Sequence, residues 1–252
     1  MGTEIIVIGT IHHEHFEAKH YTAQVVKDII LALKPDAICA ELYSKHFNVD
    51  GSLRQEVLEG AKDCPEVQAA NDAATELGIR QIPFEREGRD EIYEETNCFE
   101  RERKAMEAAD KWGDWLQANR RDSNDYRLIY AFASACGSQG QLNLRATPDI
   151  INSHAYDAVI WIKHNLIYHI IPEVMRRYPE MQETAEFWEL SGKMWDERNR
   201  TMADNLTRIA AGFPIGRLAV VTGADHRYIL RDLLSDKPGI VLREYWEVLP
   251  GK

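Results

Sequence analysis

Two histidines follow the same short pattern near opposite ends of this 252-residue chain. Near the start, IIVIGTIH leads through Gly9 to His12, and near the end LAVVTGADH leads through Gly223 to His226. In each copy a glycine follows a short apolar run that is typical of a strand. Glycine permits a sharp turn and a close approach of backbone, and open α/β sheets bind ligands at the carboxyl ends of their strands. The repetition therefore predicts one functional site that contains both histidines.

Carboxylates follow two other predicted strands. Glu41 comes after DAICA, and Glu85 comes after RQIPF, with Arg86 next to it. Imidazole and carboxylate together suit a divalent zinc, manganese or cobalt ion. We therefore expect His12, Glu41 and His226 to hold a metal ion that polarises a carbonyl group and activates water. Glu41 and Glu85 are then candidates for proton transfer as general base or acid.

A further candidate lies in the segment WDERNRTMADNL, which has the composition of a helix before the last motif. Arg198 and Met202 are four residues apart, so they share one helix face. A basic residue on that face could hold a substrate carboxylate or a developing oxyanion. Arg198 is therefore a candidate catalytic and substrate-binding residue.

Together, the blocks GTIH, AELY, ERNRTMADNL and GADH resemble the TraB, PrgY, GumN and TIKI proteins. These proteins belong to a wider group with erythromycin esterase-like and ChaN-like folds. The resemblance runs in short blocks from the first strand to about Leu234 and omits the middle of the chain. It implies a metal-dependent hydrolytic centre containing His12, Glu41, His226 and Arg198. Some members of this group are metalloproteases that trim peptides.

The resemblance also bears on the end of the third strand. Arg86 matches an arginine found there in many relatives, which implies a substrate-binding role, and Glu85 stands where an aspartate often precedes it. Many relatives carry membrane helices or export signals, and we expect neither here. The substrate of this chain is therefore expected to differ from theirs.

Three neighbours of the paired histidines have open roles. His13 and His15 extend the first motif to HHEH, which suggests a larger metal cluster, but adjacent residues on an extended chain face opposite ways. Asp225 precedes His226, and its position favours the capping of the last long helix.

The composition narrows the classes of partner. A formal net charge of −11 disfavours nucleic acid and anionic membranes. The start of the chain lacks a secretory pattern. The apolar stretch at residues 155–171 contains charged and histidine side chains, so we expect a buried or half-buried helix there. The four cysteines form no CxxC pair, which favours reduced thiols and a cytoplasmic location.

Short apolar runs alternate with helical patterns, which predicts an α/β fold with a mainly parallel central sheet flanked by helices. The predicted strands are residues 4–8, 37–40, 79–84, 218–221 and 239–242, and helices are expected at 18–33 and, with a break at Pro65, at 55–77. We expect a single domain over residues 1–252, with a helical insertion at 89–183 that forms a cap. Within the insertion, GSQGQLN at 137–143 has the composition of a loop.

These observations predict a metal-dependent hydrolase that acts on an amide or ester bond, expected in a small peptide or another small molecule. Two alternatives stay open. One is a non-enzymatic protein of ChaN-like type that binds a peptide or a haem-like ligand. The other is a metal-independent esterase that uses a histidine as its base. No membrane insertion is expected, and a homo-oligomer is compatible with the sequence.

Overall fold

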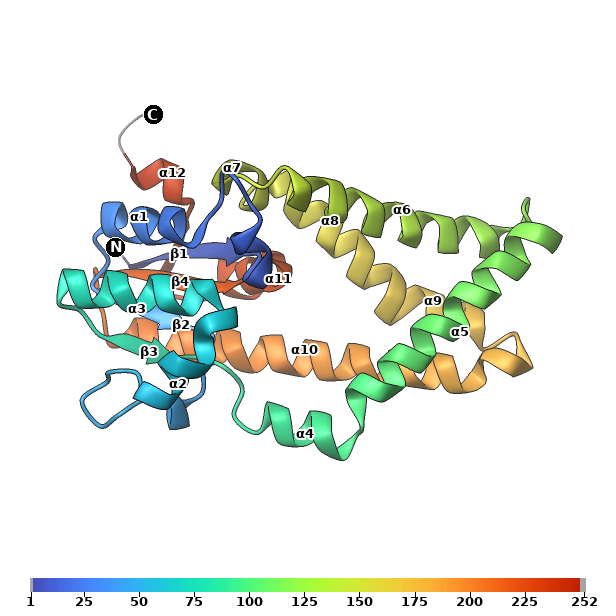
Figure 1. Ribbon diagram of the computed structural model, residues 1–252, viewed down its shortest axis with the longest axis horizontal. Coiled ribbons are helices and arrows are strands. Elements are labelled where there is room, and N and C mark those ends of the chain that lie inside the picture. The colour runs from blue at the N-terminus through green and yellow to red at the C-terminus, as the bar shows by residue number, and fades with distance from the viewer. Residues whose placement is uncertain (1, 250–252) are drawn as a thin grey trace. The chain divides into compact units, whose positions relative to one another are not determined.

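The computed structural model describes residues 2–249, whose central feature is a five-stranded, all-parallel sheet (Figure 1). The strand order is β3-β2-β4-β1-β5. The strands are β1 (Thr3–Thr10), β2 (Ala37–Ala40), β3 (Gln81–Pro83), β4 (Arg217–Gly223) and β5 (Ile240–Arg243). The predicted α/β class and the parallel sheet are confirmed, and each predicted strand is present with bounds that differ by a few residues at most.

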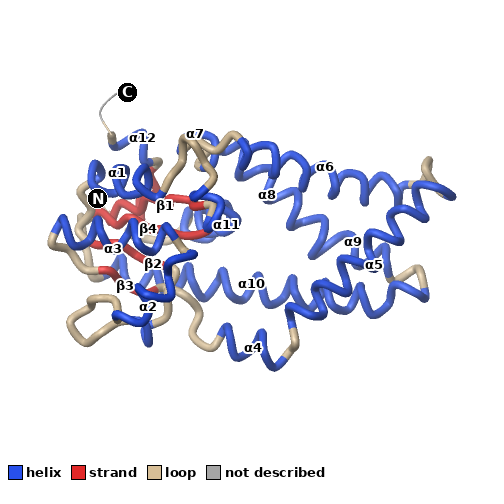
Figure 2. The backbone as a smooth tube through the Cα atoms, in the orientation of Figure 1, coloured by secondary structure: helices blue, strands red, loops and turns tan. Residues whose placement is uncertain are grey.

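The chain divides into two compact units, and Figure 2 shows that all strands belong to one of them. The first unit comprises Met1–Glu87, Gln141–Asp157 and Asn199–Lys252. Besides the sheet it contains α1 (Ala23–Leu33), α2 (Gln55–Gly60), α3 (Pro65–Leu77), α7 (Pro148–Ile151), α11 (Ala224–Ser235) and α12 (Tyr245–Val248).

The second unit, Gly88–Gly140 and Ala158–Arg198, is helical. It contains α4 (Arg89–Glu95), α5 (Cys98–Asn119), most of α6 (Asn124–Leu144) and α8 (His154–Asn165), a π-helical turn (Leu166–Ile170), α9 (Ile171–Met175) and the first part of α10 (Gln182–Ala211). These bounds differ from the predicted insertion at 89–183. Residues 141–157 pack with the sheet unit, where the Asn152 side chain accepts a hydrogen bond from Gly9 N at 2.7 Å.

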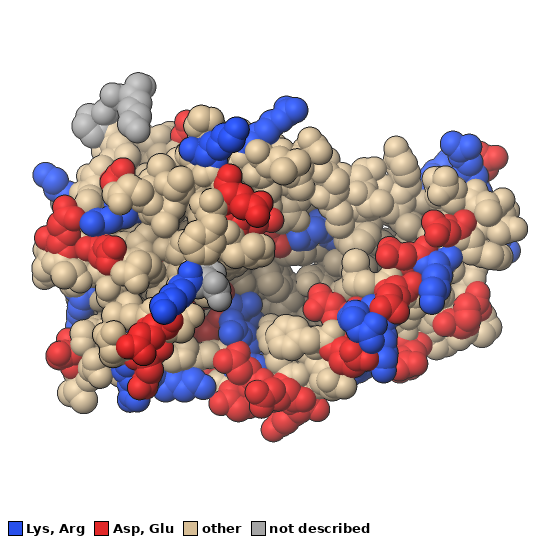
Figure 3. All heavy atoms as spheres, in the orientation of Figure 1, with Lys and Arg blue, Asp and Glu red and all other residues tan. Residues whose placement is uncertain are grey.

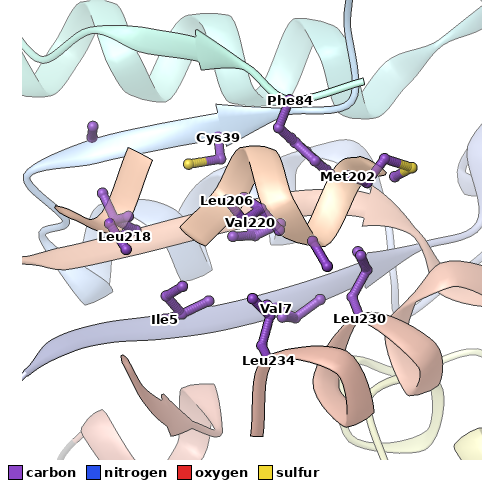
Figure 4. Close-up of a cluster of buried hydrophobic side chains, with 13 residues drawn as sticks. Ile5, Val7, Cys39, Phe84, Met202, Leu206, Leu218, Val220, Leu230 and Leu234 are labelled. Atoms are coloured by element: carbon purple, nitrogen blue, oxygen red, sulfur yellow. The ribbon is translucent and has the colours of Figure 1, made fainter. Parts of the chain in front are cut away.

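The core of the sheet unit lies between one face of the sheet and helices α10 and α11. Side chains alternate between the faces of a strand, so Ile5 and Val7 of β1 point to the same side as Leu218 and Val220 of β4 (Figure 4). Helices α10 and α11 cover this side with the buried side chains of Met202, Ala203, Leu206, Ala210, Leu230 and Leu234.

The alternate strand residues, which include Ile6, Ile8 and Ile38, are also fully buried. Their face is opposite to that of α10 and α11 by parity. Helices α1 and α3 contact each other, and α3 contacts β2. A sheet buried on both faces is the expected arrangement for parallel strands joined by helices.

Local chemistry sets the ends of these helices. The Thr22 side chain accepts a hydrogen bond from Val25 N at the start of α1, which therefore begins later than the predicted residue 18. Helix α3 begins at Pro65 and ends before Gly78, whose φ of 65° is left-handed. The predicted break and end of this helix are confirmed.

The prediction of a loop at residues 137–143 is wrong, because α6 continues through it to Leu144. Helical sequence on the preceding turns and packing of Ile129 and Phe132 into the core of the second unit support the helix. Tertiary packing of this kind outweighs the cost of about 1 kcal/mol for each glycine in a helix. At the end of α6, the Asn143 side chain donates to Glu14 and accepts from the Tyr156 hydroxyl.

The apolar stretch at residues 155–171 is helical, as predicted, with a π-helical turn at Leu166–Ile170. Within residues 2–249, no helix combines the length and apolar character needed to cross a membrane. All four cysteines lie in this part of the chain, and none of them forms a disulfide. Burial raises the pKa of the Cys39 thiol to about 12, which makes it an unreactive core residue.

A buried cluster of charges supports α11. Arg227 is fully buried, and its guanidinium group is paired with Asp157 and, at 2.5 Å, with Glu244. Arg231, one turn later, lies 2.6 Å from the second oxygen of Glu244. Burial raises the pKa of the Asp157 carboxyl group although Arg227 opposes the shift. The cluster therefore links α11 to the first turn of α8, through Asp157, and to the start of α12, through Glu244, at a substantial cost in desolvation.

We expect Arg227→Ala to lower the free energy of unfolding by roughly 3–5 kcal/mol, because it leaves two buried carboxylates without their principal cation. Urea unfolding followed by circular dichroism measures this change. The matched control is Arg243→Ala, which removes a half-exposed arginine 3.8 Å from Glu4 and should cost less than about 1 kcal/mol. Equal stability of the two variants would contradict this account.

Candidate functional site

The site is built around the carboxyl end of β4, the central strand. Its neighbours are β1, with Thr10 opposite Gly223, and β2, with Ala40 opposite Val221. The chain continues from β1 to His12 and from β2 to Glu41, while β4 continues directly into α11, which carries His226. Parallel strands end at a common edge of the sheet, so the register brings the side chains of His12, Glu41 and His226 together there. We call this group of residues the histidine corner, or the corner.

Glu41 is the residue after β2 and bonds across to β4. Its Oε2 accepts hydrogen bonds from the Thr222 hydroxyl at 2.6 Å and from Gly223 N at 2.9 Å. Its other oxygen, Oε1, lies 3.7 Å from His226 Nε2. A carboxylate that accepts a backbone N–H and a hydroxyl is fixed in orientation, so Oε1 is presented towards the histidine.

His226 is buried in the first turn of α11, with its Nδ1 2.7 Å from Asn199 Oδ1 on α10. Asn199 is fully buried. With the amide oxygen as acceptor, Nδ1 carries the proton, and a neutral His226 has its lone pair on Nε2. The ring nitrogen that can act as base or ligand is therefore the one that faces Glu41.

His12 approaches the same corner from the other side. It has a left-handed backbone, with φ of 49°, and its Nδ1 lies 2.7 Å from Glu66 Oε1. The other side of the ring lies on Gly223, where a Cβ atom would be only 2.6 Å from His12 Nε2. The His12 side chain is 55% exposed. It therefore has one nitrogen held by a carboxylate and an edge that solvent can reach.

Carboxylates around His12 favour its charged form. The hydrogen bond that His12 Nδ1 donates to Glu66 is the largest cause of the raised pKa of His12; burial opposes the shift, and the charges of Glu66, Glu41 and Asp225 add to it. Those interactions also place Glu41 and Asp225 close enough to act on His12. The imidazole of His12 is thus surrounded by negatively charged carboxylates that favour its protonated form.

Sequence reasoning missed Glu66 and Asn199. Glu66 is buried in the first turn of α3, after Pro65, where a carboxylate at a helix start has an ordinary structural explanation. Only the packing of α3 beside the His12 segment reveals its second role. Asn199 lies in the predicted segment ERNRTMADNL, but its neighbour Arg198 has the more obvious chemistry.

The structure separates the roles of His13 and His15. His15 is buried, donates from Nδ1 to the Tyr21 carbonyl at 2.5 Å and accepts Ile11 N–H at Nε2. Burial lowers the pKa of His15, so it is a neutral structural residue. His13 is exposed. Asp225 is not the cap of α11, because Gly223 occupies that position and Asp225 lies in the first turn.

Glu85 and Arg86 follow β3, one strand further from the corner. Glu85 is buried, and its carboxylate accepts a hydrogen bond from the backbone N–H of Arg86 at 2.7 Å. The Asn205 side chain donates to the Phe84 and Glu85 carbonyls. Arg198 belongs to the second unit, one residue before Asn199 on α10. The catalytic and substrate-binding roles of Glu85, Arg86 and Arg198 stay predictions.

Within residues 2–249, no three histidine, cysteine, aspartate or glutamate side chains are already gathered as a complete set of metal ligands. The separation of His226 Nε2 and Glu41 Oε1 nevertheless fits two ligands of one metal ion. Ligands of one tetrahedral zinc ion at about 2.0–2.1 Å from the metal lie roughly 3.3 Å apart, close to the 3.7 Å between His226 Nε2 and Glu41 Oε1. The hydrogen bonds at Nδ1 of both histidines match the outer partners that orient metal-binding imidazoles.

Comparisons with protein-family models, with curated proteins and with solved structures yield no match for this chain. The resemblance to the TraB and TIKI proteins therefore stays a prediction that depends on the short blocks of sequence alone.

We expect Gly223→Ala to disrupt the corner, because the new methyl group would lie 2.6 Å from His12 Nε2. His12 must move away, which should weaken its bond to Glu66 and lower stability by roughly 1–3 kcal/mol. Histidine NMR signals and urea unfolding report the two effects. Gly60→Ala is the matched control, since a Cβ at Gly60 meets nothing within 4 Å. An unchanged His12 signal in Gly223→Ala would refute the packing described here.

We expect Glu66→Gln to lower the pKa of His12 towards its usual 6.5, because Glu66 is the main cause of the raised value. A raised histidine pKa stabilises the folded state fully below pH 6.5, and this contribution disappears as pH rises through the folded-state value. The stability difference between wild type and Glu66→Gln should therefore shrink from pH 6 to pH 9. NMR titration gives the pKa directly, and a His12 pKa unaffected by the substitution would count against the ion pair.

Proposed function

We propose that the corner formed by His12, Glu41 and His226 binds a divalent transition-metal ion and hydrolyses an amide or ester bond, with a small peptide as the expected substrate. One observation carries the proposal. Both histidines have Nδ1 held by an oxygen acceptor, and each presents its Nε2 edge to Gly223 or to the Glu41 carboxylate that Gly223 N holds. Structural histidines have no need for this shared orientation.

In this proposal, His226 Nε2, Glu41 Oε1 and His12 Nε2 would hold the ion, which would polarise the substrate carbonyl and lower the pKa of water. Glu66 and Asn199 fix the tautomers and orientations of the two histidines. The hydrogen bonds from Thr222 and Gly223 hold Glu41 in place. Since His12 must be neutral to act as a ligand, protons compete with the ion.

The predicted roles of the outlying residues belong to the same proposal. Glu85 would assist proton transfer, and Arg86 and Arg198 would orient the substrate. Glu85 is buried beside the end of β3, and the backbone N–H of Arg86 holds its carboxylate in one orientation.

A second candidate is a metal-independent esterase, which the His12–Glu66 pair favours. A half-exposed imidazole whose Nδ1 donates to a buried carboxylate has the arrangement of a histidine base with its orienting acid. Here His12 Nε2 would accept a proton from water or from a substrate hydroxyl, and Glu66 would stabilise the resulting imidazolium ion.

The first experiment measures zinc, manganese and cobalt binding to the purified chain by calorimetry, beside the double variant His12→Ala/His226→Ala. We expect one ion per chain for the wild type and a loss of affinity of at least 100-fold in the variant, because two of three ligands are removed. His13→Ala is the matched control, since it removes an exposed histidine from the same segment.

Peptide and ester hydrolysis is then assayed with each ion and after exhaustive chelation. Activity that needs the ion, and that is lost on substitution of either histidine, supports the metal-dependent reading. Activity that survives chelation but disappears in Glu66→Gln supports the histidine base. If the double variant keeps both metal binding and hydrolysis, the site has been misassigned.

A further inference from the structure

The second unit contains a cavity of about 590 Å³ that is independent of the histidine corner. Residues of α5, α6, α9 and the π-helical turn line it, and all of them belong to the second unit. Small-molecule sites in proteins occupy roughly 300–1,000 Å³. The volume is thus sufficient for a ligand, whatever the sheet unit does.

The floor of the cavity is apolar. Ile167, Ile171 and Met175 are buried there, with Ile129 of α6 packed against the same core. The wall includes Met106, which is 40% exposed, on α5. An apolar lining in a concave surface favours a ligand with an apolar body.

Two carboxylates stand on the α5 side of this cavity. Asp110 and Asp114 are four residues apart, so they share a helix face and repel each other. Earlier on α5, Arg103 pairs with both Glu100 and Glu107. Asp110 and Asp114 have no such partner in the described part of the chain. Two unpaired carboxylates of α5 thus line the cavity.

Two tyrosine rings of α6 also line this cavity. Tyr126 and Tyr130 are one turn apart, with ring centroids 6.1 Å from each other and planes inclined by 36°. Tyr130 is 62% exposed. Tyrosine faces attract organic cations through their quadrupole. Among the described lining residues, no lysine or arginine accompanies them.

We propose that this cavity binds a small amphipathic organic cation, whose apolar body lies on the isoleucine and methionine floor and whose ammonium group lies among Asp110, Asp114 and the tyrosine rings. An anionic ligand would meet two carboxylates without a compensating cation. The net charge of −11 adds a general attraction for cations, and Figure 3 shows acidic side chains interspersed with basic ones over the visible face. This inference does not depend on the proposed hydrolase activity.

The test uses three probes with the same ten-carbon chain: decylamine, decanol and decanoate. Each is titrated into the full chain by calorimetry below its micelle concentration. We expect decylamine to bind at least tenfold more tightly than decanol, and decanoate to bind most weakly. In Asp110→Asn/Asp114→Asn, the amine should lose at least tenfold in affinity, whereas decanol should be unaffected. Asp232→Asn, an exposed aspartate on α11, is the matched control.

The position of binding is tested separately. Cys136 lines the cavity, so decylamine should slow alkylation of Cys136 more than that of Cys64, as measured by peptide mass spectrometry. Ala133→Trp, which fills the cavity from α6, should abolish amine binding while circular dichroism stays unchanged. Equal affinity for amine and carboxylate, or full affinity in the double asparagine variant, would overturn the proposal. If the wild type binds no amine but self-associates, and Ala133→Trp abolishes that self-association, the cavity is instead a contact between two copies of the chain.

Discussion

The corner of the sheet depends on two glycines, Gly9 and Gly223, that leave space for α11 and for the His12 ring to pack closely against the strand ends. A Cβ atom at Gly9 would lie 3.1 Å from Ala224 at the start of α11, and one at Gly223 would lie 2.6 Å from His12 Nε2. Each glycine therefore makes room for the segment that carries the other motif. Because β1 and β4 are hydrogen-bonded with Thr10 opposite Gly223, this mutual accommodation follows from the register. The repeated Gly-x-x-His pattern is one packing arrangement seen from its two sides.

The buried charges beside α11 hold the second half of this arrangement. Arg227 follows His226 directly, and its Cδ would lie 3.3 Å from a Cβ at Gly9. Its pairing with Asp157 and Glu244 joins the helix to two distant parts of the chain. The pKa of Asp157 is raised because burial outweighs the attraction of Arg227. The cluster therefore contributes little net stability, and its main effect is to fix the position of α11. The orientation of His226 thus depends on Asn199 on one side and on Arg227 through the backbone on the other.

The sequence predicted the strands and the paired histidines because both are local patterns: short apolar runs, and glycine at a fixed offset from histidine. It could not predict Glu66 or Asn199, since a carboxylate at a helix start and an amide in a charged segment have ordinary local explanations. The loop expected at residues 137–143 failed for a related reason. Glycine content describes local preference, whereas the packing of Ile129 and Phe132 is a property of the folded unit. His15 shows the reverse case, in which an apparent ligand uses both ring nitrogens on backbone groups.

The charges around His12 also determine how the corner responds to its medium. Glu66, Glu41 and Asp225 all favour the imidazolium form of His12, and the same negative charges would favour a bound divalent cation. Protons and a divalent cation would therefore compete for the negative charges around His12. One edge of the His12 ring is open to solvent, whereas the buried ring of His226 lies between Asn199 and Glu41. The two histidines therefore differ. Asn199 holds the buried ring of His226 in a fixed orientation, whereas the charge of the His12 ring depends on pH.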